Sequence, residues 1–224
     1  MPQRSRLLLV VRTPVALLIF ALTFAFAGYK ARQWSPRAAD SYSAKLTSEG
    51  VTIAVEPLFR DDLAAQVFDK DDMVTRGIMP MAIIIFNDNN FPVRVEASQI
   101  EIIGADEHIH TLPPGEVVSR IFKKGKKNVW IPQPIPRGPI GDGLNADALS
   151  DFDHKFLGSK SVAPHDKAGG FLYIHPPSTQ DVPGFLSGSR VYIPDIIRED
   201  TGTRMIFFEI DLKPAMEILP GRQR

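Results

Sequence analysis

Short segments in which polar and apolar residues alternate, separated by dense turn signals, occur along most of this 224-residue chain. A period of two residues is typical of a β-strand with one buried face, because successive side chains point to opposite sides of a sheet. About seven or eight such strands are expected, with small helices between them and no regular strand–helix rhythm. The pattern favours antiparallel sheets over a parallel sheet covered by helices. The clearest expected strands lie at 51–55, 78–86, 93–103, 171–174, 191–197 and 205–212.

Two hairpins are predicted. Residues 78–86 are almost entirely apolar, which indicates a strand buried on both faces, and the Asn/Asp-rich stretch 87–90 indicates a turn into 93–103. The alternation in 93–103 slips by one residue near Ser98, which predicts a β-bulge. The second hairpin is expected at 117–132, although its first arm also fits a helical turn.

Residues 132–144 are rich in proline and glycine, and Asn145 follows as a predicted N-cap of a helix at 146–158. This helix would pack Leu149, Phe152 and Phe156 inward, and 132–160 is interpreted as an insertion at the domain edge.

The turn at 199–202 is expected to join the last two strands. Together these features predict an antiparallel immunoglobulin-like sandwich over 49–214 with small helical insertions, followed by a tail at 215–224; a closed barrel is the alternative.

The first residues have a different character. Residues 13–28 contain no charge and follow a basic head, which predicts a hydrophobic helix acting as a signal anchor or signal peptide over 1–28. As a helix, 13–28 would span about 24 Å against a hydrocarbon core of about 30 Å, whereas counting from Leu7 gives about 31 Å. Arg12 would then reach the headgroups with its long side chain. We favour a retained single-pass anchor over secretion after cleavage at Ala27.

Basic residues are slightly more numerous and closer before the apolar segment than after it, which places the N-terminus inside and the domain outside the cytoplasmic membrane, in the periplasmic or extracellular space. Residues 29–48 are predicted to be a juxtamembrane linker. Within it, Tyr29 and Trp34 are candidates for aromatic anchors at the membrane interface.

The charge of the chain divides into two unlike parts. The chain has 26 basic and 26 acidic residues, but residues 1–37 hold six bases and no acid, so 20 bases face all 26 acids in the remainder. A net acidic domain gives no electrostatic signature of nucleic-acid binding. The absence of cysteine excludes disulfides, thiolate metal sites, a cysteine nucleophile and a lipid anchor on cysteine.

His108 and His110 form the most suggestive metal-ligand pair, because residues two apart on a strand point to the same side. Asp106 or Glu107 would add a carboxylate, but the remaining histidines lie in separate segments, and two exposed histidines on a solvated turn explain the pattern equally well.

Several other patterns lack the context that their chemistry needs. Asp151 and His154 share a helix face, as polar positions of an amphipathic helix do. Ser159 and Ser161 have no nucleophile-elbow motif around them. The glycines at 138–143 fit neither a dinucleotide motif nor a P-loop, and Lys126 lacks the P-loop glycines. The acidic residues Asp69, Asp71 and Asp72 are not followed by a calcium-binding loop. We therefore assign no catalytic, cofactor-binding or metal-binding residue.

Five bases gather within eight residues at 120–127: Arg120, Lys123, Lys124, Lys126 and Lys127. Such a cluster either contacts anionic lipid or another polyanion, or keeps the tip of an exposed hairpin soluble. We favour the second interpretation.

The basic head with its apolar segment, the sequence 77–80 leading into an apolar strand that ends in Asn87-Asp88-Asn89, and 169–173 (GGFLY) together loosely resemble uncharacterised exported or membrane-anchored bacterial proteins with an immunoglobulin-like domain. The resemblance implies a non-enzymatic cell-envelope protein that is tethered through its N-terminal helix and acts through contacts with an envelope protein. Two alternatives remain: a metal-dependent or hydrolytic enzyme whose site is assembled only in the fold, and a ligand-binding β-barrel.

Overall fold

The computed structural model describes residues 28–104, 108–122 and 145–216. The hydrophobic helix predicted at the N-terminus lies outside these residues, apart from Gly28. Among the residues that the structure describes, no helix is both long and apolar enough to cross a membrane.

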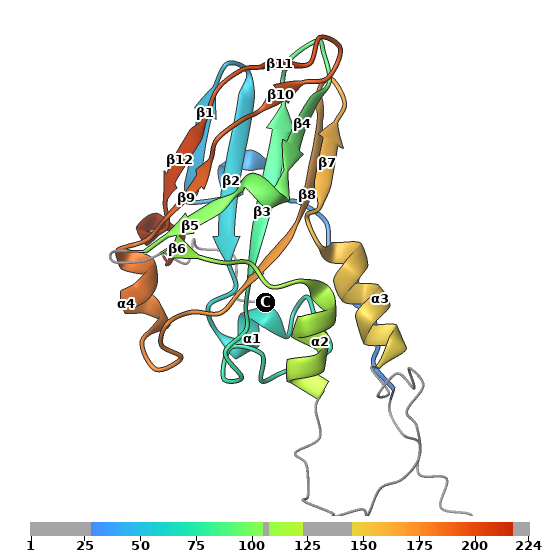
Figure 1. The fold of residues 1–224 in the computed structure, drawn as a ribbon, viewed down its shortest axis with the longest axis vertical. Coiled ribbons are helices and arrows are strands. Elements are labelled where there is room, and N and C mark those ends of the chain that lie inside the picture. Colours follow the sequence, from blue (N-terminus) through green and yellow to red (C-terminus); the bar gives the residue numbers. More distant parts are fainter. Residues whose placement is uncertain (1–27, 105–107, 123–144, 217–224) are drawn as a thin grey trace, which may run out of the picture.

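The described chain is mainly β and forms three antiparallel sheets of four strands each, as the alternating pattern predicts (Figure 1). The largest sheet has the strand order β1-β2-β3-β8, with long pairings between β2 and β3 and between β3 and β8. Its strands are β1 (Ala44–Ser48), β2 (Val51–Pro57), β3 (Met79–Asn87) and β8 (Asp166–Ile174).

The other two sheets are built from successive pieces of the same chain segments. One has the order β11-β10-β4-β7 and the other β12-β9-β5-β6. Because β4 leads into β5, β9 into β10 and β11 into β12, the two small sheets lie end to end and act as one bent layer (Figure 1). Their strands are β4 (Val93–Glu96), β5 (Glu101–Ile103), β6 (His108–Ile109), β7 (Ser159–Val162), β9 (Arg190–Ile193), β10 (Ile197–Arg198), β11 (Thr203–Arg204) and β12 (Phe208–Asp211).

Helices gather mainly at one end of the molecule (Figure 1). They are α1 (Asp61–Ala64), α2 (Pro114–Phe122), α3 (Ala146–Lys155) and α4 (Val182–Ser187), with 3-10 turns at η1 (Ala39–Ser41), η2 (Ala97–Gln99) and η3 (Lys213–Met216). The predicted cap of α3 is confirmed, because the Asn145 side chain accepts a hydrogen bond of 3.1 Å from the Ala148 amide. Such a cap satisfies an amide that has no partner inside the helix.

The hairpin predicted around residues 87–90 is wrong. Strand β3 pairs with β2 and β8, whereas β4 pairs with β7 and β10 in a different sheet. The buried Asn87 side chain explains the corner, since its amide nitrogen donates to the carbonyls of Phe91, Val162 and Ala163. The Asn/Asp-rich stretch therefore carries the chain between sheets instead of folding it back on itself.

Three further expectations are corrected. The slip in alternation near Ser98 is the 3-10 turn η2, at which the chain leaves one small sheet and enters the other, and not a bulge. The first arm of the second predicted hairpin is helix α2, which agrees with the helical alternative and not with a strand, and its second arm lies outside the described residues. The predicted strand at 191–197 is divided into β9 and β10, which belong to different sheets. The turn at 199–202 does join β10 to β11.

The folded part of the chain begins before residue 49, the predicted start of the domain. Strand β1 begins at Ala44, inside the stretch 29–48 expected to be a linker. The inward packing predicted for helix α3 is confirmed at Phe152, which is fully buried and whose ring stacks on Phe68 at 4.6 Å between centroids. Strand β2 is buried on both faces although polar and apolar residues alternate in its sequence. Other parts of the chain must therefore cover the outer face of the large sheet.

Candidate functional site

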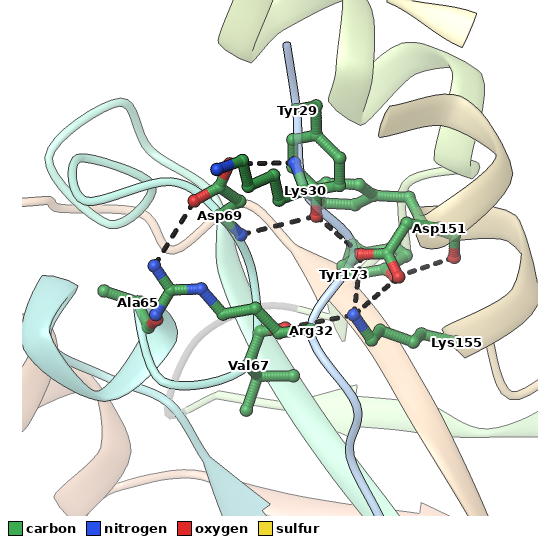
Figure 2. A network of polar contacts seen from close by, with 10 residues as sticks. Tyr29, Lys30, Arg32, Ala65, Val67, Asp69, Asp151, Lys155 and Tyr173 are labelled. Carbon is green, nitrogen blue, oxygen red and sulfur yellow. Dashed lines mark hydrogen bonds and ion pairs between the residues drawn. The ribbon is translucent and has the colours of Figure 1, made fainter. Parts of the chain in front are cut away.

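Residues 29–37, here called the N-terminal strap, cross the helical end of the domain between α3 and the loop after α1 (Figure 2). The strap begins one residue after Gly28, the last residue of the predicted apolar segment. Its contacts form a polar network that is buried around Asp151 and Lys155.

Tyr29 fastens the start of the strap. Its side chain is buried, and its hydroxyl donates a 2.5 Å hydrogen bond to the Asp151 carboxylate of α3. The Tyr29 ring also meets the edge of Phe122, the last residue of α2, at 5.8 Å between centroids. The first strap residue thus binds two helices at once, and it lies inside the protein instead of serving as the predicted interfacial anchor.

Asp151 and Lys155 form a buried ion pair on consecutive turns of α3. Both side chains are 6% exposed, and the Lys155 ammonium lies 2.7 and 2.6 Å from the two carboxylate oxygens. The ammonium also donates to the Val67 carbonyl at 3.0 Å. An ammonium has three donors, so all three are used here. Lys155 therefore has a positioning role and has no free donor with which to bind an anion or act as a nucleophile.

Burial governs the titration of this cluster. It lowers the pKa of the Lys155 ammonium, an effect that the adjacent Asp151 carboxylate opposes. Burial, together with the hydrogen bond to Asp151, raises the pKa of Tyr29 above the usual range of a phenol. Tyr173, whose hydroxyl donates to the Phe152 carbonyl at 2.8 Å, has its pKa raised by burial as well. Both phenols therefore stay protonated at neutral pH and act as donors.

The middle of the strap binds the loop after α1. The Lys30 amide donates to the Asp69 carboxylate at 2.9 Å, and Arg32 donates to the same carboxylate and to the Ala65 carbonyl. The Lys30 amide and the Arg32 guanidinium lower the pKa of Asp69. Asp69 is thus bound by the strap, and Asp72, another member of the acidic stretch that lacks a calcium-binding loop, pairs with Lys70 and Arg76.

The end of the strap covers the outer face of the large sheet. Trp34 packs on Phe171 at 4.6 Å between ring centroids, and a side chain at Gly169 would come within 3.1 Å of the indole. Arg37 donates to the buried Glu56 of β2 at 2.5 Å. The absence of a side chain at Gly169 lets the strap lie close to β8, and Arg37 covers Glu56 on β2.

Open clefts flank the strap. One of about 360 Å³ is lined by Arg32, Trp34, Asp151, His154 and Lys155, among others. One of about 400 Å³ opens between Tyr29 and the exposed side of α3. Solvent therefore reaches both sides of the strap. Its position depends on its polar and aromatic contacts with the domain.

The histidines singled out from the sequence do not assemble a site within the described residues. His108 is 64% exposed and lies 3.2 Å from Glu101, while His110 is exposed beyond the end of β6. Asp106 and Glu107 lie outside the described residues. Where the structure describes the chain, no group of three or more potential ligands converges.

The remaining candidates have other partners. Asp151 lies in the strap network, whereas His154 is exposed at the cleft beside it. Ser159 and Ser161 donate to Glu96 and Glu199. Arg120 pairs with Glu116 on α2. The rest of the basic cluster, Lys126 included, and the glycines at 138–143 lie outside the described residues.

Sequence analysis missed the buried network itself. The spacing of Asp151 and Lys155 by four residues was the available signal, since oppositely charged residues at this spacing are neighbours on a helix. Their burial was not visible, because it depends on residues 29–37, which are more than a hundred positions away in the sequence.

No family model matches the chain, and no curated protein matches it significantly. Among solved structures, a candidate lipoprotein from Bacillus subtilis is similar over 77% of this chain and 39% of its own, with 10% identity and a TM-score of 0.36. The chain thus spans well under half the length of that protein. A likeness at this level identifies neither family nor function.

Proposed function

We propose that this protein is a non-enzymatic, single-pass membrane protein of the cell envelope, with its domain outside the cytoplasmic membrane and acting through contacts with another envelope protein. The observation that carries the proposal is the strap. An apolar segment flanked by basic residues is followed, without a spacer, by residues that are fastened into the domain. Such a short connection between the apolar segment and the domain is better suited to a domain that stays at the membrane surface than to one that is secreted after cleavage.

The proposal includes an immunoglobulin-like sandwich. In support, β2, β3 and β8 are neighbours in one layer, while β7, β4/β5, β10/β9 and β11/β12 follow one another in the second. The chain crosses between layers after β3, after β7 and after β8, as Greek-key sandwiches do. The layers also meet where β1 lies beside β12 and β7 beside β8.

The buried polar groups support a structural rather than a catalytic role for the helical end. Lys155 uses its three donors, and Asp151 accepts from both Lys155 and Tyr29. A catalytic side chain needs a donor or acceptor atom that is free to contact the substrate. The polar atoms of Lys155, Asp151 and Tyr29 contact one another instead. Sandwich domains in general present their outer surfaces and loops to partners.

Cell fractionation of the full chain with a C-terminal tag tests the proposal. We expect the tagged protein to remain with the membrane after spheroplast formation, at full length, and to be digested by protease added from outside. Cleavage of a signal peptide after Ala27 would shorten the protein by about 27 residues. Release of such a shortened protein from the membrane would overturn the proposal of a retained anchor. The matched control is Ala27→Leu, which removes the small residue needed for cleavage and leaves a retained anchor unchanged.

A further inference from the structure

We infer that the helical end of the domain, where the strap begins and α2 ends, faces the bilayer. This inference rests on the proposed membrane anchor. It adds an orientation and a contact surface, which an anchor by itself does not specify.

The chain enters the domain at its helical end. Tyr29 is buried and touches Phe122 and Asp151, so the strap is fixed from its first residue. One residue spans at most about 3.6 Å, so Gly28 must lie within a few ångströms of the tyrosine backbone. A flexible linker of twenty residues would instead allow an end-to-end distance of about 25 Å and any orientation. The membrane segment therefore ends beside α2 and α3.

Aromatic and basic side chains lie together at this end. Phe122 is half-buried at the terminus of α2, and Lys70, which pairs with Asp72, places its ammonium 6.0 Å from the Phe122 ring. Lys30 is exposed beside Tyr29. Aromatic rings together with basic side chains are typical of the headgroup region.

The two ends of the long axis carry different elements (Figure 1). The β10–β11 turn lies at the opposite end of the long axis from α1 and α2 (Figure 1). A domain fastened by its helical end therefore directs this turn away from the membrane, and the two ends must differ in their distance from lipid.

The experiment uses the natural absence of cysteine. Ala146→Cys, at the start of α3, and Thr201→Cys, in the β10–β11 turn, each replace an exposed residue and accept one fluorophore. The full-length variants are reconstituted in phosphatidylglycerol-containing vesicles with a headgroup-linked nitroxide quencher. We expect at least a threefold larger quenching constant at position 146 than at 201. Equal quenching at both positions overturns the orientation, whereas failure to float with vesicles overturns the anchor instead.

A matched variant tests the fastening itself. Twelve Gly/Ser residues inserted between Gly28 and Tyr29 leave the strap docked and add a reach of about 20 Å. We expect the thermal midpoint of the domain to stay unchanged and the quenching at position 146 to fall to the level at 201 in phosphatidylcholine vesicles. Unchanged preferential quenching in these neutral vesicles would contradict the claim that the short connection orients the domain.

Discussion

The two ends of this domain use charged side chains in opposite ways. At the helical end, the pair formed by Asp151 and Lys155 is 6% exposed and holds the strap through Tyr29. At the other end, Arg94 lies between Glu96 and Glu199 with a 39% exposed side chain. A buried charge depends on its partner, whereas an exposed charge has water as a substitute. The buried pair therefore fixes one geometry, and the exposed one tolerates change.

The largest effect is expected for Lys155→Met, which removes the ammonium and leaves the buried Asp151 carboxylate without its partner. Breaking a buried pair from one side costs about 3–5 kcal/mol of unfolding free energy. Urea denaturation followed by circular dichroism measures the loss.

The matched control is Asp151→Leu combined with Lys155→Met, which replaces both charges by apolar groups of similar size. Such replacement is often neutral or stabilising, so the double variant should recover most of the stability. If it is as unstable as the single variant, the loss comes from packing and not from an unpaired charge.

The next largest effect is expected where a glycine allows two backbone segments to pack closely. A side chain at Gly170 would lie 2.6 Å from the Cα of Leu157, which crosses β8 after α3 and donates its amide to Phe171. Gly170→Ala must push this backbone away and should cost about 3 kcal/mol, at the upper end of overpacking effects. Gly115→Ala in α2 is the control, because its side chain would meet nothing within 4 Å and alanine favours a helix. Thermal unfolding of both variants gives the comparison.

The sequence predicted strands better than their partners. Of the strand predicted at 205–212, only 208–211 form β12, and there buried and exposed residues alternate as predicted, because a period of two depends only on local backbone geometry. The false hairpin at 87–90 arose because a turn signal specifies a change of direction but not the sheet that the next strand joins. That choice depends on the Asn87 hydrogen bonds to residues 162 and 163, which are distant in the sequence.

The strap shows the same limit for the candidate site. Tyr29 and Trp34 have a composition that suits an interface with lipid, and no local pattern distinguishes that role from burial. The decisive features are the glycine at position 169 and the acid at position 151, both far away in the chain. The helix that carries Asp151 was nevertheless predictable, since its cap and its apolar spacing are local.

A smaller effect is expected for Tyr29→Phe, which keeps the ring against Phe122 and removes the hydroxyl that binds Asp151. A hydrogen bond to a charged group contributes about 1.5 kcal/mol or more, so chemical denaturation at neutral pH should show a loss of about that size. Lys155 keeps the carboxylate paired, which is why the effect is smaller than that of Lys155→Met.

The same variant has a pH signature. Because the pKa of Tyr29 is raised from its ordinary value of 10.0, the unfolded chain loses this proton first as the pH rises. The stabilisation is therefore complete below pH 10 and decreases above it, by up to about 1.4 kcal/mol per pH unit for one group. The alkaline slope of the unfolding free energy should be shallower in Tyr29→Phe than in the wild type; identical slopes would falsify the role of this phenol.

The smallest effect belongs to the exposed end, where Arg94→Gln removes the cation between Glu96 and Glu199. Both glutamates keep another donor, since Ser159 donates to Glu96 and Ser161 to Glu199. Exposed pairs contribute about 1 kcal/mol or less, so the unfolding free energy should change by no more than this, and the change should shrink in 1 M salt. A loss near that of Lys155→Met, unaffected by salt, would show that the two ends are held by the same kind of interaction and would remove the contrast between them.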